Sequence, residues 1–262
     1  MAVRDRSSSG ETYARTAPAE EIPQLLRSAD PAVLLALMDN PALNEQHAEI
    51  LLRRADLPPV VLAALASHPT LSASYAVRRD IVRHPHAPRR VALRWVRQLY
   101  LFDLVRLTQL PAVSAELKRI AEDTLIARLP QISLGEKLTL ARRASARVAS
   151  ALLAEGIPLA VRPALDNPSL TEAHLLQLLA RDELAPHVVA AIGEHPRWSH
   201  RPGVRMALVR HPATPPVSVR ALLPELTLDE LQDLVALGRL QPERRQWLEQ
   251  EIVQRVQSGR SR

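Results

Sequence analysis

The sequence predicts an all-α fold, and three features of its composition lead to that prediction. Apolar residues make up 47 % of the 262 residues, and most of them are Leu, Ala and Val, of which Leu and Ala favour helices. Aromatic residues amount to 3 % and Gly to 7 residues, which disfavours sandwiches and barrels. The 22 Pro suit many short helices, each begun by a Pro in its first turn.

A long segment of the chain occurs twice. Residues 39–69 and 166–196 are identical at 16 of 31 positions, with a constant numbering offset of 127 and no gap. At the same offset VRRDIVRHP aligns with VRMALVRHP. Further along, DLVRL at 103–107 aligns with DLVAL at 233–237 if the alignment is shifted by three residues. A self-similarity of this length predicts an internally duplicated chain.

A finer pattern inside each copy marks the helix boundaries. The residue before a Pro is pushed out of the α region, so Asn-Pro and His-Pro pairs end helices. Between these pairs the apolar residues follow a helical i, i+3, i+4 spacing. We therefore predict helices over residues 20–28, 31–38, 44–54, 58–67, 74–83, 87–99, 101–109, 113–128, 134–142, 144–154, 158–165, 171–180, 184–193, 201–210, 214–223, 228–236 and 241–257.

Helices this short bury an apolar face only when they stack in series. The sequence thus predicts an α-solenoid, with a first helical-repeat half over residues 19–133 and a second half over residues 134–257. Residues 1–18 are polar and aperiodic and are predicted to be a disordered N-terminal tail, and residues 258–262 a basic tail.

Two consecutive motifs carry a family resemblance. The run x-P-x-x-V-L-x-x-L-A-x-H-P, followed by x-V-R-x-x-(I/L)-V-R-H-P, resembles the variant leucine-rich repeats and HEAT-like repeats of bacteria. LGEKLTLARRAS at 134–145, NPSLTE at 167–172 and HPRWSHRPGVRMALVRHPATPP at 195–216 are similar to a family of uncharacterised bacterial helical-repeat proteins. The resemblance covers roughly residues 20–257 and implies a right-handed superhelix but no activity.

The sequence departs from the enzymes and metal proteins of this architecture. It has no Cys for an iron–sulfur segment and no His-Glu dinucleotide of the kind that holds iron in some HEAT-like enzymes. HEAT-like DNA alkylation glycosylases share the expected architecture, but none of their motif residues matches a position here. We expect no cofactor, no metal site and no membrane span, and a cytoplasmic location.

Positive charge is concentrated at equivalent places of the two copies. The chain has a net charge of +6, to which residues 76–97 contribute +6, residues 197–224 contribute +5 and the remainder −5. The planar guanidinium group of Arg is well suited to binding phosphate, and aromatic side chains nearby could stack on nucleic-acid bases. The candidate anionic-ligand surface consists of Arg78, Arg79, Arg83, Arg89, Arg90, Arg94, Arg97, Arg201, Arg205, Arg210 and Arg220, with Tyr75, Trp95 and Trp198 as candidate stacking residues.

The same residues also have a structural interpretation. Arg78 and Arg205 recur at one repeat position, where an Arg stem packs along the next repeat and pairs with a carboxylate or carbonyl. Trp95 and Trp198 fit packing between repeats. This interpretation is the one we favour.

These features lead to three hypotheses about function. The first is a non-enzymatic scaffold that binds a protein partner on a concave surface. The second is a nucleic-acid or polyanion binder that uses both Arg clusters. The third, by fold analogy alone, is a HEAT-like DNA-lesion-processing enzyme, which needs a carboxylate and an aromatic side by side in a basic groove.

Overall fold

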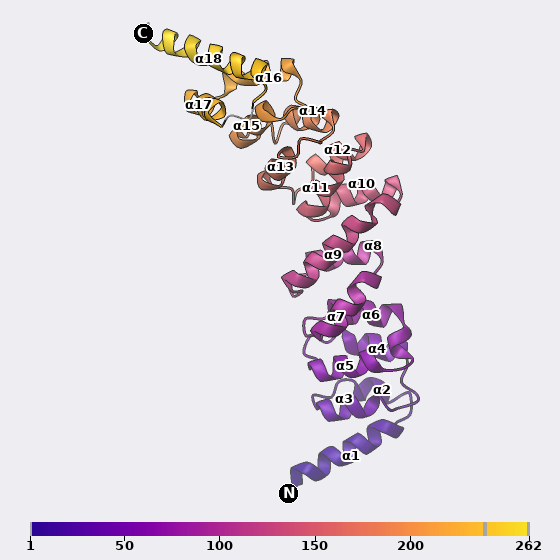
Figure 1. The fold of residues 1–262 in the computed structure, drawn as a ribbon. Coiled ribbons are helices and arrows are strands. Elements are labelled where there is room, and N and C mark those ends of the chain that lie inside the picture. The colour runs from indigo at the N-terminus through magenta and orange to yellow at the C-terminus, as the bar shows by residue number, and fades with distance from the viewer. Residues whose placement is uncertain (1, 238–239, 261–262) are drawn as a thin grey trace. The chain divides into compact units, whose positions relative to one another are not determined.

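The computed structural model describes residues 2–237 and 240–260, with side chains from residue 9 to residue 257, and these ranges are helical without a strand (Figure 1). Each range predicted to be helical contains a helix whose ends lie within a few residues of the prediction. The first half holds α1 (Ala2–Thr16), α2 (Ile22–Leu25), α3 (Pro31–Leu37), α4 (Glu45–Leu52), α5 (Pro59–Ser67), α6 (Tyr75–Arg83), α7 (Arg89–Trp95), α8 (Leu101–Gln109) and α9 (Ala115–Arg128).

The second half has the same order of elements. It holds α10 (Leu134–Arg143), α11 (Ala146–Glu155), α12 (Pro158–Leu165), α13 (Glu172–Leu179), α14 (Pro186–Glu194), α15 (Pro202–Arg210), α16 (Pro216–Leu222), α17 (Leu228–Ala236) and α18 (Pro242–Arg260). Short 3₁₀ turns at Val96–Gln98 and Leu223–Glu225 follow α7 and α16.

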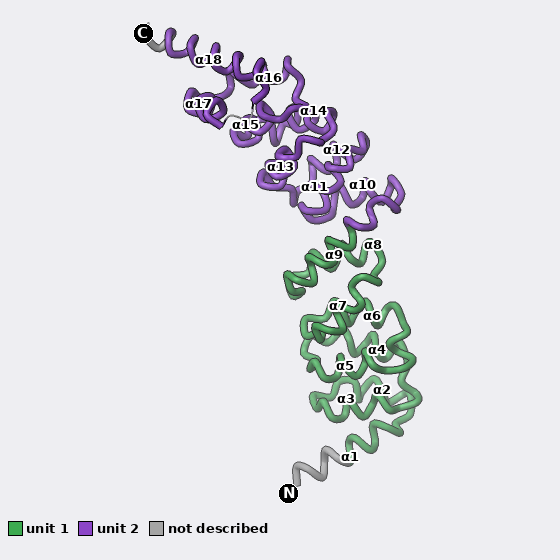
Figure 2. Tube along the Cα trace, in the orientation of Figure 1, with its two compact units in different colours: residues 1–125 green, residues 126–262 purple. Residues whose placement is uncertain are grey.

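The chain divides into two compact units, residues 1–125 (unit 1) and residues 126–262 (unit 2), shown in Figure 2. The division falls inside α9, eight residues before the boundary at 133/134 that the sequence predicts. Within unit 1, α1 contacts α3 and α3 contacts α5, while α2 contacts α4 and α4 contacts α6. Unit 2 repeats this with α10, α12 and α14 in one row and α11, α13 and α15 in the other. In each unit, six of the helices therefore form two rows of three.

The structure sharpens the duplication and corrects one part of it. Helices α4 to α8 have the same lengths as α13 to α17 and lie at the same constant numbering offset, as do the two 3₁₀ turns. Because α8 and α17 align without a gap, the three-residue slip predicted at 103–107 is wrong. The segment at 103–107 corresponds to 230–234, and its buried Leu104 and Leu107 match the buried Leu231 and Leu234.

The predicted disordered tail over residues 1–18 is also wrong. Residues 2–16 form α1, and Ala14 and Ala17 are buried. The side-chain amide of Asn40 donates to the carbonyl oxygens of Ala14 at 2.8 Å and Ala17 at 3.0 Å. The sequence shows no apolar stripe here because α1 is held by small residues and by a polar group from another segment.

The predicted basic tail is partly helical. Helix α18 continues to Arg260, so residues 258–260 belong to it, while residues 261–262 lie outside the described ranges. Among the helices described, none is sufficiently long and apolar to cross a bilayer.

Candidate functional site

Most Arg side chains of the first cluster are occupied inside unit 1. The guanidinium of Arg79 donates to both carboxylate oxygens of Asp80, at 2.7 and 3.0 Å. Arg83 donates to Asp103 at 2.5 Å. Arg89 forms an exposed two-bond pair with Glu116 at 2.6 and 2.8 Å. Arg83 thus joins α6 to α8 and Arg89 joins α7 to α9, whereas Arg79 pairs within α6.

Arg78 and Arg205 have the role that the structural interpretation predicts. Arg78 donates to the side-chain oxygen of Gln98 at 2.9 Å, and Arg205 donates to the backbone oxygen of Glu225 at 2.9 Å. Gln98 and Glu225 themselves occupy equivalent positions of the two copies. Both Arg residues thus fasten the end of the following 3₁₀ turn.

The remaining candidates are exposed. Arg220 lies over the ring of Trp247, 4.5 Å from its centroid. Arg97 is exposed and has an interaction partner. No hydrogen bond or ion pair to another described side chain holds the exposed residues Arg90, Arg94, Arg201 and Arg210.

Two of the three predicted stacking residues are unavailable to a ligand. Trp95 is 5 % exposed and Trp198 is 2 % exposed, and the indole N–H of Trp198 donates to the carbonyl oxygen of Leu165 at 3.0 Å. Both side chains are core residues, as the structural interpretation favours. Arg197 covers the Trp198 ring at 4.2 Å from its centroid.

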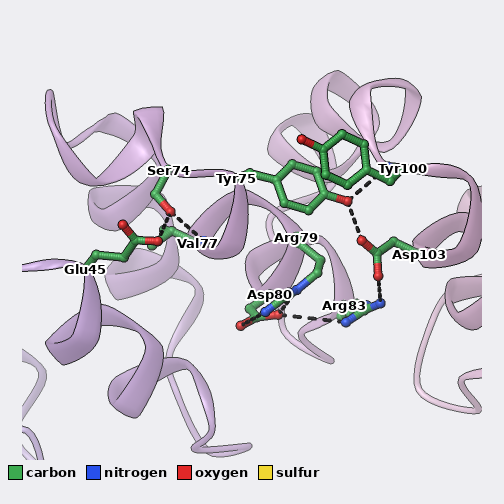
Figure 3. Close-up of polar contacts among 9 residues, drawn as sticks. All are labelled: Glu45, Ser74, Tyr75, Val77, Arg79, Asp80, Arg83, Tyr100 and Asp103. Carbon is green, nitrogen blue, oxygen red and sulfur yellow. Dashed lines mark hydrogen bonds and ion pairs between the residues drawn. The ribbon is translucent and has the colours of Figure 1, made fainter.

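The third stacking candidate, Tyr75, belongs to an aromatic cluster at the start of α8 (Figure 3). Its ring stacks on the ring of Tyr100, with centroids 4.0 Å apart and planes inclined by 23°. Its hydroxyl accepts from the backbone N–H of Tyr100 at 2.9 Å and donates to the Asp103 carboxylate. We call Tyr75, Tyr100 and the neighbouring Phe102 the aromatic surface.

A comparison of α8 with α17 explains the position of the Tyr75 hydroxyl. Thr227, the N-cap of α17, forms a capping box with Glu230, whose carboxylate accepts the Thr227 N–H at 2.7 Å. The residues that correspond to Thr227 and Glu230 in the first copy are Tyr100 and Asp103. There, the Tyr75 hydroxyl stands between the N-cap N–H and the carboxylate and completes the cap.

This environment shifts the acid–base chemistry of Tyr75. Partial burial, reinforced by the hydrogen bond to Asp103, raises its pKa from 10.0 to about 12. The phenol is protonated at neutral pH, serves as a donor and stays protonated to a higher pH than an ordinary tyrosine. Both oxygens of Asp103 accept a bond, one from Tyr75 and one from Arg83, so the carboxylate joins α8 to α6.

Two of the histidines that precede Pro, His84 and His211, link neighbouring helices. The Nε2 of His84 lies 2.7 Å from the carbonyl oxygen of Arg54, and the Nε2 of His211 lies 2.9 Å from that of Arg181. These carbonyls follow the preceding helix of the same row. No group of three or more His, Asp or Glu side chains suited to a metal ion occurs in the part of the chain that the structure describes.

The surface that sequence reasoning missed is the exposed part of this cluster. Tyr100 is 65 % exposed and Phe102 is 45 % exposed, and they stand at the N-cap and in the first turn of α8. In the second copy Thr227 and Asp229 occupy their places. An alignment that kept the gapless offset would have paired these residues and revealed the difference.

Comparisons with known proteins find no matching family model, and no significant match among curated proteins or solved structures.

Proposed function

We propose that this chain is a non-enzymatic α-solenoid scaffold, of the HEAT-like or variant leucine-rich-repeat type, whose protein partner contacts the aromatic surface of unit 1. The concave binding face and the cytoplasmic location that the sequence predicts belong to this proposal. The observation that carries it is the exposure of Tyr100 and Phe102 at the start of α8.

The fold does not need these two aromatic side chains. Helix α17 has the same length and the same register with Thr227 and Asp229 in their places. Thr is a far better N-cap than an aromatic residue, and an acidic residue in the first turn interacts favourably with the helix dipole. The first copy therefore carries two residues that are worse for the helix and that expose apolar area to water.

An exposed aromatic pair is suited to protein recognition. Tyr and Arg are over-represented among the residues that dominate binding free energy at protein interfaces. The Tyr75–Tyr100 stack restricts the Tyr100 ring before any partner arrives, which lowers the entropy cost of binding. Only 3 % of the residues are aromatic, so a cluster of them at one place on unit 1 favours a binding role for that place.

A two-residue exchange between the copies tests the proposal. The wild-type chain and the Tyr100→Thr/Phe102→Asp variant are immobilised, and proteins retained from a cell extract are quantified by mass spectrometry. We expect a defined protein to bind the wild type and to be lost from the variant, with unchanged far-UV circular dichroism. Arg89→Ala, which breaks an exposed ion pair of the same unit, serves as the control and should retain the partner.

The proposal is wrong if no protein depends on the two aromatic residues, or if Arg89→Ala removes the same proteins. If a defined protein is retained, its binding to the purified chain is measured next. The proposal requires that the Tyr100→Thr/Phe102→Asp exchange raise the dissociation constant by at least about tenfold, which is the effect of losing one strong interface residue.

Nucleic-acid binding is the second candidate, and the exposed Arg90, Arg94, Arg201 and Arg210 are what supports it. It predicts binding of single-stranded DNA or RNA that weakens steeply with salt and is lost when these four are changed to Ala. Negligible binding at low salt would exclude it. The burial of Trp95 and Trp198 makes base stacking by those residues unavailable and weighs against this candidate.

A lesion-processing enzyme receives less support. Asp103 and Tyr75 do form a carboxylate–aromatic pair beside Arg83, but each group is engaged in capping α8 or in an ion pair. We therefore keep the non-enzymatic proposal.

A further inference from the structure

Unit 2 has a hollow of about 540 Å³ between α13 and α15. Its apolar wall includes Leu176, Leu179 and Met206, and its polar groups include Asp182 and Arg210. A volume of this size accepts several side chains of a peptide or one small molecule. None of its lining residues belongs to the aromatic surface, so this site is independent of the proposed function.

The first copy has charged side chains at two of the corresponding lining positions. Met206 corresponds to Arg79 and Ala207 to Asp80, which form a two-bond ion pair in unit 1 (Figure 3). The exchange of this pair for a thioether and a methyl group leaves apolar surface where the first copy has guanidinium and carboxylate. Two lining positions of the hollow are thus apolar where the first copy carries an ion pair.

Two substitutions between the copies remove from Arg210 the partners that its counterpart has. Its counterpart Arg83 lies 2.5 Å from Asp103 and 3.9 Å from Asp80. In unit 2, Ala207 replaces Asp80, and Glu230, which replaces Asp103, caps the N–H of Thr227. Arg210 is exposed and makes no ion pair with a carboxylate in the described part of unit 2.

We infer that the α13–α15 hollow binds a peptide segment in which an aliphatic side chain lies next to a single Asp or Glu. The aliphatic group packs on Leu176, Leu179 and Met206. The carboxylate pairs with Arg210 and takes the place that Asp80 and Asp103 have beside Arg83.

Nearby acidic groups explain why the ligand carries one negative charge rather than many. Asp182 lines the hollow, and a Cβ on Gly203 would lie 2.8 Å from a carboxylate oxygen of Glu172. These carboxylates repel a polyanion such as nucleic acid. A peptide with one acid places its charge at Arg210 and leaves uncharged groups toward the others.

Methionine methyl resonances report binding at this site directly. The chain has 3 Met (Met1, Met38 and Met206), so ε-¹³C-methionine labelling gives a simple spectrum in which Met206 marks the hollow. The probe is the peptide acetyl-Ala-Leu-Glu-Leu-Ala-amide, and its twin with Gln in place of Glu is the matched control. We expect saturable shifts of the Met206 signal, with binding of the Gln twin roughly tenfold weaker because the charged hydrogen bond is lost.

Two variants of the full chain test the mechanism. Arg210→Gln should make the two peptides bind equally. Met206→Arg/Ala207→Asp transfers the Arg79–Asp80 ion pair of the first copy, which the repeat already accommodates, and should abolish binding of fluorescently labelled peptide. Unchanged circular dichroism shows that each variant is folded.

Three results would overturn the inference. The first is a Met206 signal that millimolar peptide does not move. The second is equal affinity for the Glu and Gln peptides in the wild type. The third is a Met206 signal that responds to octanoate or to a single-stranded oligonucleotide but not to the peptide.

Discussion

Asn40 and Asn167, which occupy equivalent positions of the two copies, make the same hydrogen bonds in the two units. The amide nitrogen of Asn167 donates to the carbonyl oxygens of Ala141 at 2.7 Å and Ala144 at 3.1 Å, just as Asn40 donates to Ala14 and Ala17. Each side-chain oxygen also accepts the backbone N–H two residues later, at 2.8 Å. The Asn of each Asn-Pro pair therefore fastens the end of the first helix of its unit.

Replacement of Asn40 by Ala should release α1. The change removes three hydrogen bonds and leaves buried carbonyl oxygens without a donor, so we expect unfolding to become easier by about 1–3 kcal/mol. Urea denaturation and protease sensitivity of residues 2–16 provide the measurement. Asp39→Ala is the control, because its exposed pair with Arg15 is worth less than about 1 kcal/mol. Equal effects of the two substitutions would contradict the anchoring role of Asn40.

Arg244 gives a second prediction, for the packing of α18. It is 3 % exposed, and its guanidinium donates to the backbone oxygens of Val209, His211, Pro212 and Thr214 at 2.5–3.0 Å. Burial lowers its pKa from the ordinary value. The first copy has Leu117 at this position, so the cation is specific to unit 2.

Arg244→Ala should destabilise unit 2 by at least about 2 kcal/mol, because four carbonyl oxygens lose a charged donor. Hydrogen exchange in α18 should accelerate. The neighbouring Arg245→Ala breaks an exposed pair with Glu249 and should cost no more than about 0.5 kcal/mol. Protection of α18 that is unchanged in Arg244→Ala would show that the helix is held by its apolar face alone.

The sequence predicts local structure well and long-range polar contacts poorly. Asn-Pro and His-Pro pairs locate the helix ends because proline acts on the residue directly before it. Helix α1 escapes prediction since its anchor, Asn40, lies 26 residues from Ala14. The Arg-rich composition is visible in the sequence, but whether a guanidinium bonds a carbonyl, as in Arg205, or stays exposed, as in Arg210, depends on the fold. Tyr100 and Phe102 were missed because the assumed slip paired α8 with the wrong residues of α17.

The raised pKa of Tyr75 predicts a dependence of stability on alkaline pH. The folded state favours the protonated phenol, whose pKa is about 12 against 10.0 in the unfolded chain. The contribution of Tyr75 to the free energy of unfolding is therefore complete below pH 10 and decreases as the pH rises toward 12. Absorbance at 295 nm should show a late tyrosinate transition that Tyr75→Phe removes. A Tyr75→Phe titration identical to that of the wild type would contradict the hydrogen-bonded position of the phenol.

The cap of α8 predicts that the effect of Tyr75→Phe on stability depends on the residues at positions 100 and 103. Tyr75→Phe removes the hydroxyl that accepts the Tyr100 N–H, so we expect it to destabilise unit 1 by about 1 kcal/mol. In a Tyr100→Thr/Asp103→Glu background, α8 acquires the capping-box residues that Thr227 and Glu230 supply in α17. The N-cap N–H then has a direct carboxylate partner and no longer needs Tyr75.

The same Tyr75→Phe change should therefore cost less in that background, by about 0.5–1 kcal/mol, in a double-mutant cycle measured by urea denaturation. Loss of the Tyr75–Tyr100 stack is common to both variants that carry the Tyr100→Thr change, so it cancels in the cycle. Any change in the Arg83–Asp103 ion pair that Asp103→Glu causes is also common to both of these variants and cancels in the same way. Equal costs in the two backgrounds would mean that the hydroxyl does not substitute for the capping box. A smaller cost would show that the first copy has replaced a local cap by a contact from the neighbouring helix, and that this replacement allows an exposed aromatic residue to occupy the N-cap.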